Sequence, residues 1–151
     1  MATPGGQNVM AFEIGRNDLG TATALYASVV AYLNTTTTGV MQRGWTVRVL
    51  ANIASAPALQ AEIVPYRAAL RDPQFLTDTL TANNHAFEGK LSVVDTDLII
   101  DGGQTNFATS ADAADPVHYA GDNTHPTILG AKLCVTGGDV PARGVASGLT
   151  G

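Results

Sequence analysis

The sequence predicts an α/β domain built around a parallel sheet. Short apolar segments rich in Val, Ile and Leu alternate with longer segments in which apolar residues recur at helical spacing. The resulting order of strand, helix, strand, helix, strand, loop and helix favours parallel strands joined by right-handed crossovers. The chain has 151 residues, of which 45% are hydrophobic and 14% charged, a composition typical of one globular domain.

The predicted strands cover residues 9–14, 45–53 and 91–95, and the last could extend to Ile100. Their Val, Leu and Ile content suits a sheet that is covered on both faces. Ligands of such sheets bind beyond the carboxyl ends of the strands. We therefore expect the functional residues to gather at that edge.

Residues 21–33 and 58–70 are predicted to be helices, because their apolar residues return to one face. Pro65 should kink or restart the second helix. Asp72 and Pro73 supply a capping carboxylate and a first-position proline for a further helix.

The remaining segments are irregular. Residues 101–124 form a long loop, and a loop of this length in a compact domain is usually functional. Residues 1–8 read as a flexible lead-in and residues 137–151, rich in Gly, Ala and Ser, as a loosely held tail. The domain itself is assigned to residues 9–136.

The long loop ends in Asp122-Asn-Thr-His125, directly before Pro126. Proline is favoured at the first position of a helix, so Pro126 should start the last helix with His125 at its mouth. A carboxylate three residues before an imidazole can orient one ring nitrogen and leave the other to act as a base. An ordinary helix cap is the alternative interpretation, and His118 is itself interpreted as a surface or capping residue.

The first strand runs directly into Gly15-Arg16-Asn17-Asp18. Gly15 allows a tight turn, and the side-chain amide of Asn17 can stabilise an oxyanion. Ordinary turn chemistry is the alternative interpretation of this segment.

Together, the Gly15–Asn17 and Asp122–His125 segments resemble the third and fifth sequence blocks of the SGNH (GDSL-type) ester hydrolases. The resemblance implies that Asn17 is an oxyanion donor and that Asp122 and His125 are members of a catalytic triad. It also implies a three-layer, flavodoxin-like parallel sheet. No metal or other cofactor is expected.

In that family the nucleophilic serine lies in a Gly-Asp-Ser block after the first strand. Here eight residues precede Val9 and none of them is serine. Ser55, in the loop after the second predicted strand, is the remaining candidate nucleophile, although a Ser-Ala-Pro loop is also a common turn.

The family sheet has about five parallel strands with the serine-bearing strand in the middle. The resemblance therefore implies that the first strands are missing here and that residues 9–14 form an edge. The segment is apolar, and Glu13 is the only residue of the kind that protects edges. We expect the chain to form a homo-oligomer or to dock onto another chain through this edge.

Two functions remain open on this basis. The chain could be the C-terminal part of an SGNH-type serine ester hydrolase, acting on carboxylic or carbohydrate esters and inactive without a serine-bearing segment. Alternatively, it could be a non-catalytic structural or binding module of the same fold, such as a virion or assembly component.

Composition excludes several partners. The net charge is −5, which argues against a nucleic-acid surface. No apolar run is long enough to span a membrane, so no membrane partner is expected. Cys134 is the only cysteine, so no intrachain disulfide can form. The compartment stays open, and a secreted or virion-associated location would fit.

Overall fold

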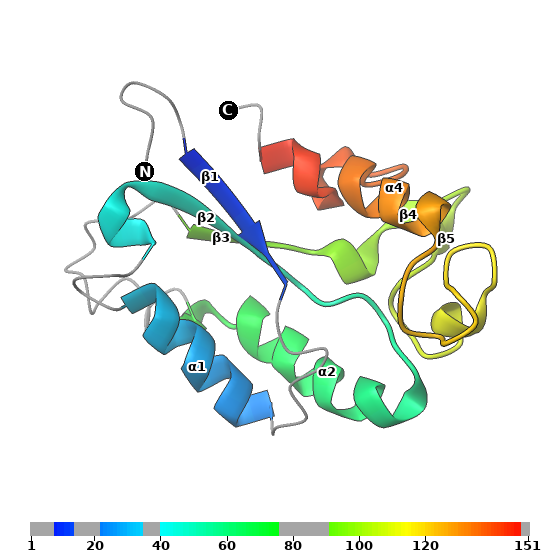
Figure 1. Ribbon diagram of the computed structural model, residues 1–151, viewed down its shortest axis with the longest axis horizontal. Helices are drawn as coiled ribbons and strands as arrows, with labels where there is room; N and C mark the ends of the chain where they lie inside the picture. Colours follow the sequence, from blue (N-terminus) through cyan, green and yellow to red (C-terminus); the bar gives the residue numbers. More distant parts are fainter. Residues whose placement is uncertain (1–7, 14–21, 35–39, 76–90, 149–151) are drawn as a thin grey trace.

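A computed structural model describes residues 8–13, 22–34, 40–75 and 91–148. Its centre is a three-stranded sheet in the order β1 (Asn8–Phe12), β2 (Trp45–Leu50) and β3 (Leu91–Val94). Both pairings are parallel, with Val9 opposite Thr46 and Val47 opposite Leu91 (Figure 1). The predicted α/β class with a parallel sheet is confirmed. Within the described residues β1 pairs with β2 alone, so it lies at an edge of the sheet, as predicted.

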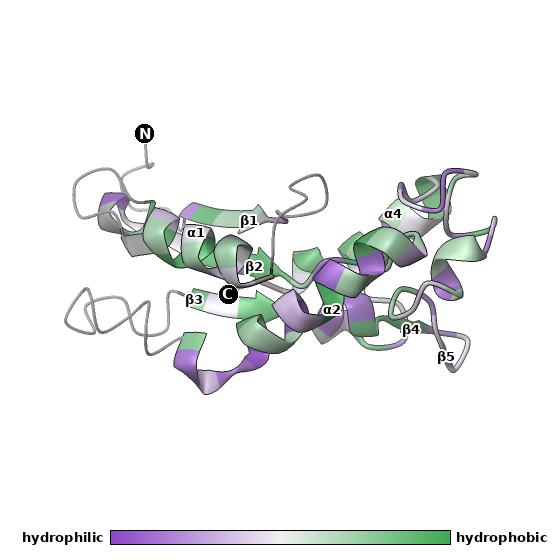
Figure 2. Cartoon of the chain, turned by 90° about the horizontal axis from the view of Figure 1, so that it is seen from below, coloured by the Kyte–Doolittle hydropathy of each residue, from purple (hydrophilic) through white to green (hydrophobic). Residues whose placement is uncertain are grey.

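Helices α1 (Ala22–Asn34) and α2 (Pro57–Arg71) lie against one face of the sheet and contact each other (Figure 1). Hydrophobic residues predominate in α1 and in β2 (Figure 2). The buried core of this layer consists of Val29, Leu33, Val40, Met41, Val47, Val49, Tyr66, Leu70, Phe75 and Leu91. Val29 and Leu33 of α1 both belong to this core.

Helix α4 (Ile128–Thr136) and the 3₁₀ turns η4 (Pro141–Arg143) and η5 (Val145–Gly148) lie on the other side of the sheet (Figure 1). A second core cluster lies where the chain continues past β2 and β3, and it comprises Ile53, Ala54, Ile99, Phe107, Ala113, Tyr119 and Leu133. This cluster fixes the long loop against the carboxyl edge of the sheet. None of the helices in the described ranges is long and apolar enough to cross a membrane.

At Pro65, helix α2 does not restart, which was one of the two outcomes that the sequence left open. The helix begins at Pro57, where a proline at the first position leaves no donor unsatisfied, and it continues through Pro65 to Arg71 without restarting. Asp72 then caps the following turn, since its Oδ1 accepts the N–H of Gln74 at 2.8 Å. The further helix that was predicted to start at Asp72 and Pro73 would continue into residues 76–90, which lie outside the described part of the chain.

Strand β3 ends at Val94, well before Ile100. The chain turns instead into the 3₁₀ turn η2 (Thr96–Leu98), where the Thr96 hydroxyl donates to the carbonyl of Ala51. The loop that follows is not wholly irregular, because β4 (Ile100–Asp101) and β5 (Gln104–Thr105) form a small antiparallel hairpin. Its two glycine turn residues have φ values of 60° and 78°, which glycine adopts without strain.

The tail from Gly137 is not loosely held over its described part, residues 137–148. The N–H of Asp139 donates to the carbonyl of Ile100 at 2.7 Å, and Nη1 of Arg143 donates to the carbonyl of Leu98 at 2.5 Å. Gly144 is buried against the end of α4, where an added Cβ would overlap the backbone of residues 135–137. These close backbone approaches explain why glycine is needed at Gly137, Gly138 and Gly144.

Candidate active site at the carboxyl edge of the sheet

Asp122 and His125 form a hydrogen-bonded pair, as the sequence predicted. Oδ2 of Asp122 lies 2.6 Å from Nδ1 of His125. The other carboxylate oxygen, Oδ1, accepts the backbone N–H groups of Thr124 at 2.9 Å and of His125 at 3.0 Å. One aspartate therefore orders the whole turn and the imidazole at the same time.

The surroundings of Asp122 favour its ionised form. The backbone N–H of His125, the His125 ring and the backbone N–H of Thr124 all hold the pKa of this carboxyl well below its usual range. An ionised carboxylate is purely an acceptor, so the Nδ1 that faces it carries the proton in the neutral imidazole. The lone pair then resides on Nε2. Because the side chains of His125 and Asp122 are 66% and 50% exposed, this base is accessible from solvent.

The helix after His125 starts later than predicted. Pro126 is not its first residue: it pairs with Tyr119 in an isolated antiparallel bridge. Helix α4 begins at Ile128, because Thr127 acts as the N-cap and its Oγ1 accepts the N–H of Gly130 at 3.2 Å. His125 thus lies in a narrow antiparallel turn, where its carbonyl accepts the N–H of Ala120 at 2.8 Å.

The turn is attached to the sheet through Ser55, in the loop after β2. The Ser55 hydroxyl donates to Oγ1 of Thr124 at 3.2 Å, and Ser55 is fully buried. A buried hydroxyl that is engaged with Thr124 is not presented to an ester carbonyl. The structure therefore argues against Ser55 as the nucleophile and gives it a structural contact with the Asp122–His125 turn.

Asn17 and Gly15 lie outside the described residues, so the predicted oxyanion donor stays a prediction. Strand β1, which leads toward them, is parallel to β2. Its carboxyl end consequently lies at the same edge of the sheet as the loop that carries Ser55.

A second pair with the same spacing was missed by the sequence analysis. Oδ2 of Asp115 lies 2.6 Å from Nδ1 of His118, and the N–H of Val117 and the His118 ring lower the pKa of Asp115. His118 was expected to be a surface or capping residue, but its side chain is only 13% exposed and its ring lies edge-on to Phe107, 6.0 Å between centroids. The repeated Asp-x-x-His spacing was the signal that could have revealed this pair.

Four charged residues, Arg67, Arg71, Asp95 and Asp97, form an ion-pair network that no local sequence pattern predicted. Arg67 is buried and donates from Nε to the carbonyl of Asn52 at 2.5 Å and from Nη1 to that of Ala108 at 2.9 Å. Asp97 is also buried and pairs with both Arg67, at 3.5 Å, and Arg71. The network ties α2 to the segments that follow β2 and β3.

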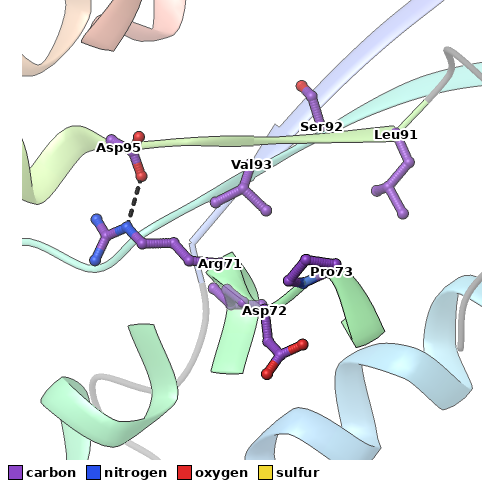
Figure 3. Close-up of a pocket in the computed structure, with 8 residues that line it drawn as sticks. Arg71, Asp72, Pro73, Leu91, Ser92, Val93 and Asp95 are labelled. Carbon is purple, nitrogen blue, oxygen red and sulfur yellow. Dashed lines mark hydrogen bonds and ion pairs between the residues drawn. The ribbon is translucent and has the colours of Figure 1, made fainter. Parts of the chain in front are cut away.

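A pocket of about 370 Å³ lies between the end of α2 and β3. Arg71 and Asp95 both line it and are hydrogen-bonded to each other (Figure 3), with Nε of Arg71 2.8 Å from Oδ1 of Asp95. Its other lining residues are Leu70, Asp72, Pro73, Leu91, Ser92 and Val93. Neither Asp122 nor His125 lines this pocket, so it is separate from the candidate site.

In the described part of the chain, no three His, Cys, Asp or Glu side chains come together as a metal site would require. The contact between Asp122 and His125 orients an exposed imidazole, an arrangement that can transfer protons. Comparisons with protein-family models, curated proteins and solved structures gave no match.

Proposed function

We propose that this chain is the C-terminal part of an SGNH (GDSL-type) serine ester hydrolase, with a flavodoxin-like arrangement of its sheet. The observation that carries the proposal is the 2.6 Å contact between Asp122 Oδ2 and His125 Nδ1, at the carboxyl edge of a parallel sheet. An exposed imidazole oriented by an ionised carboxylate is the general-base half of a triad.

In the proposed reaction, Nε2 of His125 removes the proton from a serine hydroxyl as Oγ attacks the ester carbonyl carbon. The Asn17 amide donates to the oxyanion of the tetrahedral intermediate. The intermediate collapses when His125 passes the proton to the leaving alcohol, which leaves an acyl-serine. Water then attacks the acyl-serine as His125 takes one of its protons. When the second intermediate collapses, the bond from the carbonyl carbon to Oγ breaks and His125 returns the proton to Oγ, which releases the acid and restores the free serine.

The serine is proposed to come from another polypeptide segment that docks along β1. Support comes from the position of β1, which in the described residues has a strand partner on one side only. A strand added parallel to β1 would deliver its carboxyl end to the edge where His125 lies. A homo-oligomer formed through the same edge is the other arrangement that would cover it.

A non-catalytic module is the second candidate function. It is favoured by the surroundings of His125, since in the described ranges the hydrogen bonds of its ring are confined to Asp122. An assembly component with this fold would keep the Asp122–His125 turn as a structural element.

Complementation with a serine-bearing segment separates the two functions. The chain would be fused, through a flexible linker, to a strand that ends in Gly-Asp-Ser, with a Gly-Asp-Ala fusion as the matched control. We expect the serine fusion to hydrolyse a short-chain aryl ester and the alanine fusion and the unfused chain to show only background hydrolysis. Stable docking of the strand with no hydrolysis by either fusion would favour the non-catalytic module.

A further inference from the structure

The Asp122–His125 turn has a strained backbone position at its centre. Asn123 has a φ of 54°, in the left-handed region, which asparagine adopts more readily than most residues but still at a cost relative to glycine. Such conformations persist when the surrounding structure holds them in place. The side chains of the pair are exposed, so packing around them supplies little of that restraint.

Thr124 lies between the two residues of the pair and bonds to the turn twice. Its N–H donates to Oδ1 of Asp122 at 2.9 Å, and its hydroxyl lies 3.2 Å from the carbonyl of Asp122. These bonds are local to the turn. The hydroxyl also accepts from Ser55, which is 69 residues away in the sequence. This contact connects the turn to the end of β2.

Ser55 is held in the loop after β2 by hydrogen bonds of its own. Its N–H donates to Oε1 of Gln60 at 3.0 Å, and Nε2 of Gln60 donates to the carbonyl of Ala108 at 2.9 Å. The preceding N–H, that of Ala54, donates to the carbonyl of Phe107 at 2.7 Å. Ser55 is thus a rigid, buried donor aimed at a strained, exposed turn.

We propose that Ser55 is a positioning residue of the candidate active site: through Thr124, its hydroxyl holds the turn in the conformation that keeps Asp122 and His125 hydrogen-bonded. The proposal rests on the proposed function for the role of His125 as a base, but the geometry that it describes exists in the chain alone. Ser55 acts here on the dyad and makes no contact with substrate.

The test is the tautomer of His125, measured by long-range ¹H–¹⁵N correlation on the full-length labelled chain and assigned with His125→Gln. At a pH where the imidazole is neutral, the Asp122 contact keeps the proton on Nδ1. Ser55→Ala and Thr124→Val each remove one hydroxyl of the link. We expect each to lower the ratio of the Nδ1–H to the Nε2–H form by roughly threefold or more, the equivalent of one net hydrogen bond.

Two controls separate positioning from general loosening of the fold. Thr124→Ser keeps the accepting hydroxyl and should retain the wild-type ratio. Ser28→Ala removes an exposed hydroxyl on α1 that bonds to the carbonyl of Ala24, and it should also leave the ratio unchanged. Thr124→Val also removes the bond of the hydroxyl to the carbonyl of Asp122, so a fall in that variant counts for the proposal only together with a fall in a Ser55 variant. If Ser55→Ala prevents folding, Ser55→Cys takes its place: it fills the buried site with a much weaker hydrogen-bond donor and should also lower the ratio.

An unchanged ratio in Thr124→Val would overturn the proposal, as would an equal fall in Thr124→Val and Thr124→Ser. The measurement requires no esterase activity. If the tautomer ratio falls as expected while the complemented chain stays inactive, the positioning role stands and the hydrolase function fails. If the tautomer ratio is unchanged but the complemented chain is active, the hydrolase function stands and the positioning role of Ser55 fails.

Discussion

Oδ2 of Asp122 lies 2.6 Å from Nδ1 of His125, while Oδ1 of the same carboxylate accepts two backbone N–H groups of the turn. Because both oxygens are used, orientation of the imidazole and formation of the turn are coupled. A change that neutralises Asp122 should therefore disturb backbone and ring together.

The first prediction concerns the pH dependence of this pair. The pKa of Asp122 is depressed in the folded chain, so the stability it contributes is present above the ordinary aspartate pKa and is lost as pH falls toward the depressed value. Carbon-13 NMR of the Asp122 carboxyl should show no titration midpoint near the ordinary value of about 3.9. The urea-unfolded chain provides the control and should titrate there. A folded-state midpoint at the ordinary value would contradict the described hydrogen bonds.

The second prediction concerns the buried ion pair of Arg67 and Asp97, whose side chains are 4% and 3% exposed. Asp97→Asn removes one charge and leaves the other buried, which should lower the free energy of unfolding by about 3–5 kcal/mol. Asp95→Asn is the matched control, because Asp95 pairs with Arg71 at a half-exposed position and should cost no more than about 1 kcal/mol. Urea unfolding measures the free energy of both variants. An equal decrease in the two would show that the buried pair of Asp97 contributes no more to stability than the half-exposed pair of Asp95.

The third prediction concerns the contact between α4 and the His118 loop. A Cβ at Gly130 would overlap the carbonyl oxygen of His118, whereas one at Gly121 would meet nothing within 4 Å. Gly130→Ala should therefore destabilise the chain by about 1–3 kcal/mol through overpacking. Gly121→Ala should be near neutral. Thermal unfolding of the two variants side by side checks this, and a neutral Gly130→Ala would mean that α4 is not seated as described.

The fourth prediction concerns assembly. The β1 edge should make the chain an oligomer or a partner for another chain, since unpaired strand edges favour association. Light scattering at micromolar concentration should give a mass above the 15.6 kDa of one chain. A monodisperse monomer with β1 amides protected from hydrogen exchange would show that another segment of the chain covers the edge.

The strands were predictable because their Val, Leu and Ile content is a local signal. The predicted end of the third strand, Asp95, is within one residue of the observed end at Val94. The sequence left open an extension to Ile100, because Ile99 and Ile100 continue the apolar run. That extension does not form: Thr96 and Asp97 find partners on Ala51, Arg67 and Arg71, far along the chain, and a strand signal within a short window cannot include such partners.

In the candidate site, too, local contacts could be predicted from the sequence and long-range contacts could not. Asp122 and His125 are three residues apart, so their contact follows from spacing within one turn. The predicted start of α4 at Pro126 was wrong because two local signals compete. Pro126 suits a first helical position, but the side chain of Thr127 caps the helix, which begins at Ile128. The contact between Ser55 and Thr124 spans 69 residues and depends on the parallel register of the sheet, which sequence spacing alone does not contain.

The proposed general-base role of His125 is tested most directly by comparing the two Asp-x-x-His pairs in one assay. His125→Gln and His118→Gln would each be placed in the chain fused to the Gly-Asp-Ser strand, and kcat for aryl-ester hydrolysis would be measured. His125→Gln should lower kcat by about 10³-fold or more, since loss of the base leaves only binding and oxyanion stabilisation. His118→Gln, which alters a mostly buried ring outside the proposed chemistry, should retain kcat within about tenfold. Equal losses in the two variants, or full activity in His125→Gln, would contradict the assignment of His125 as the base.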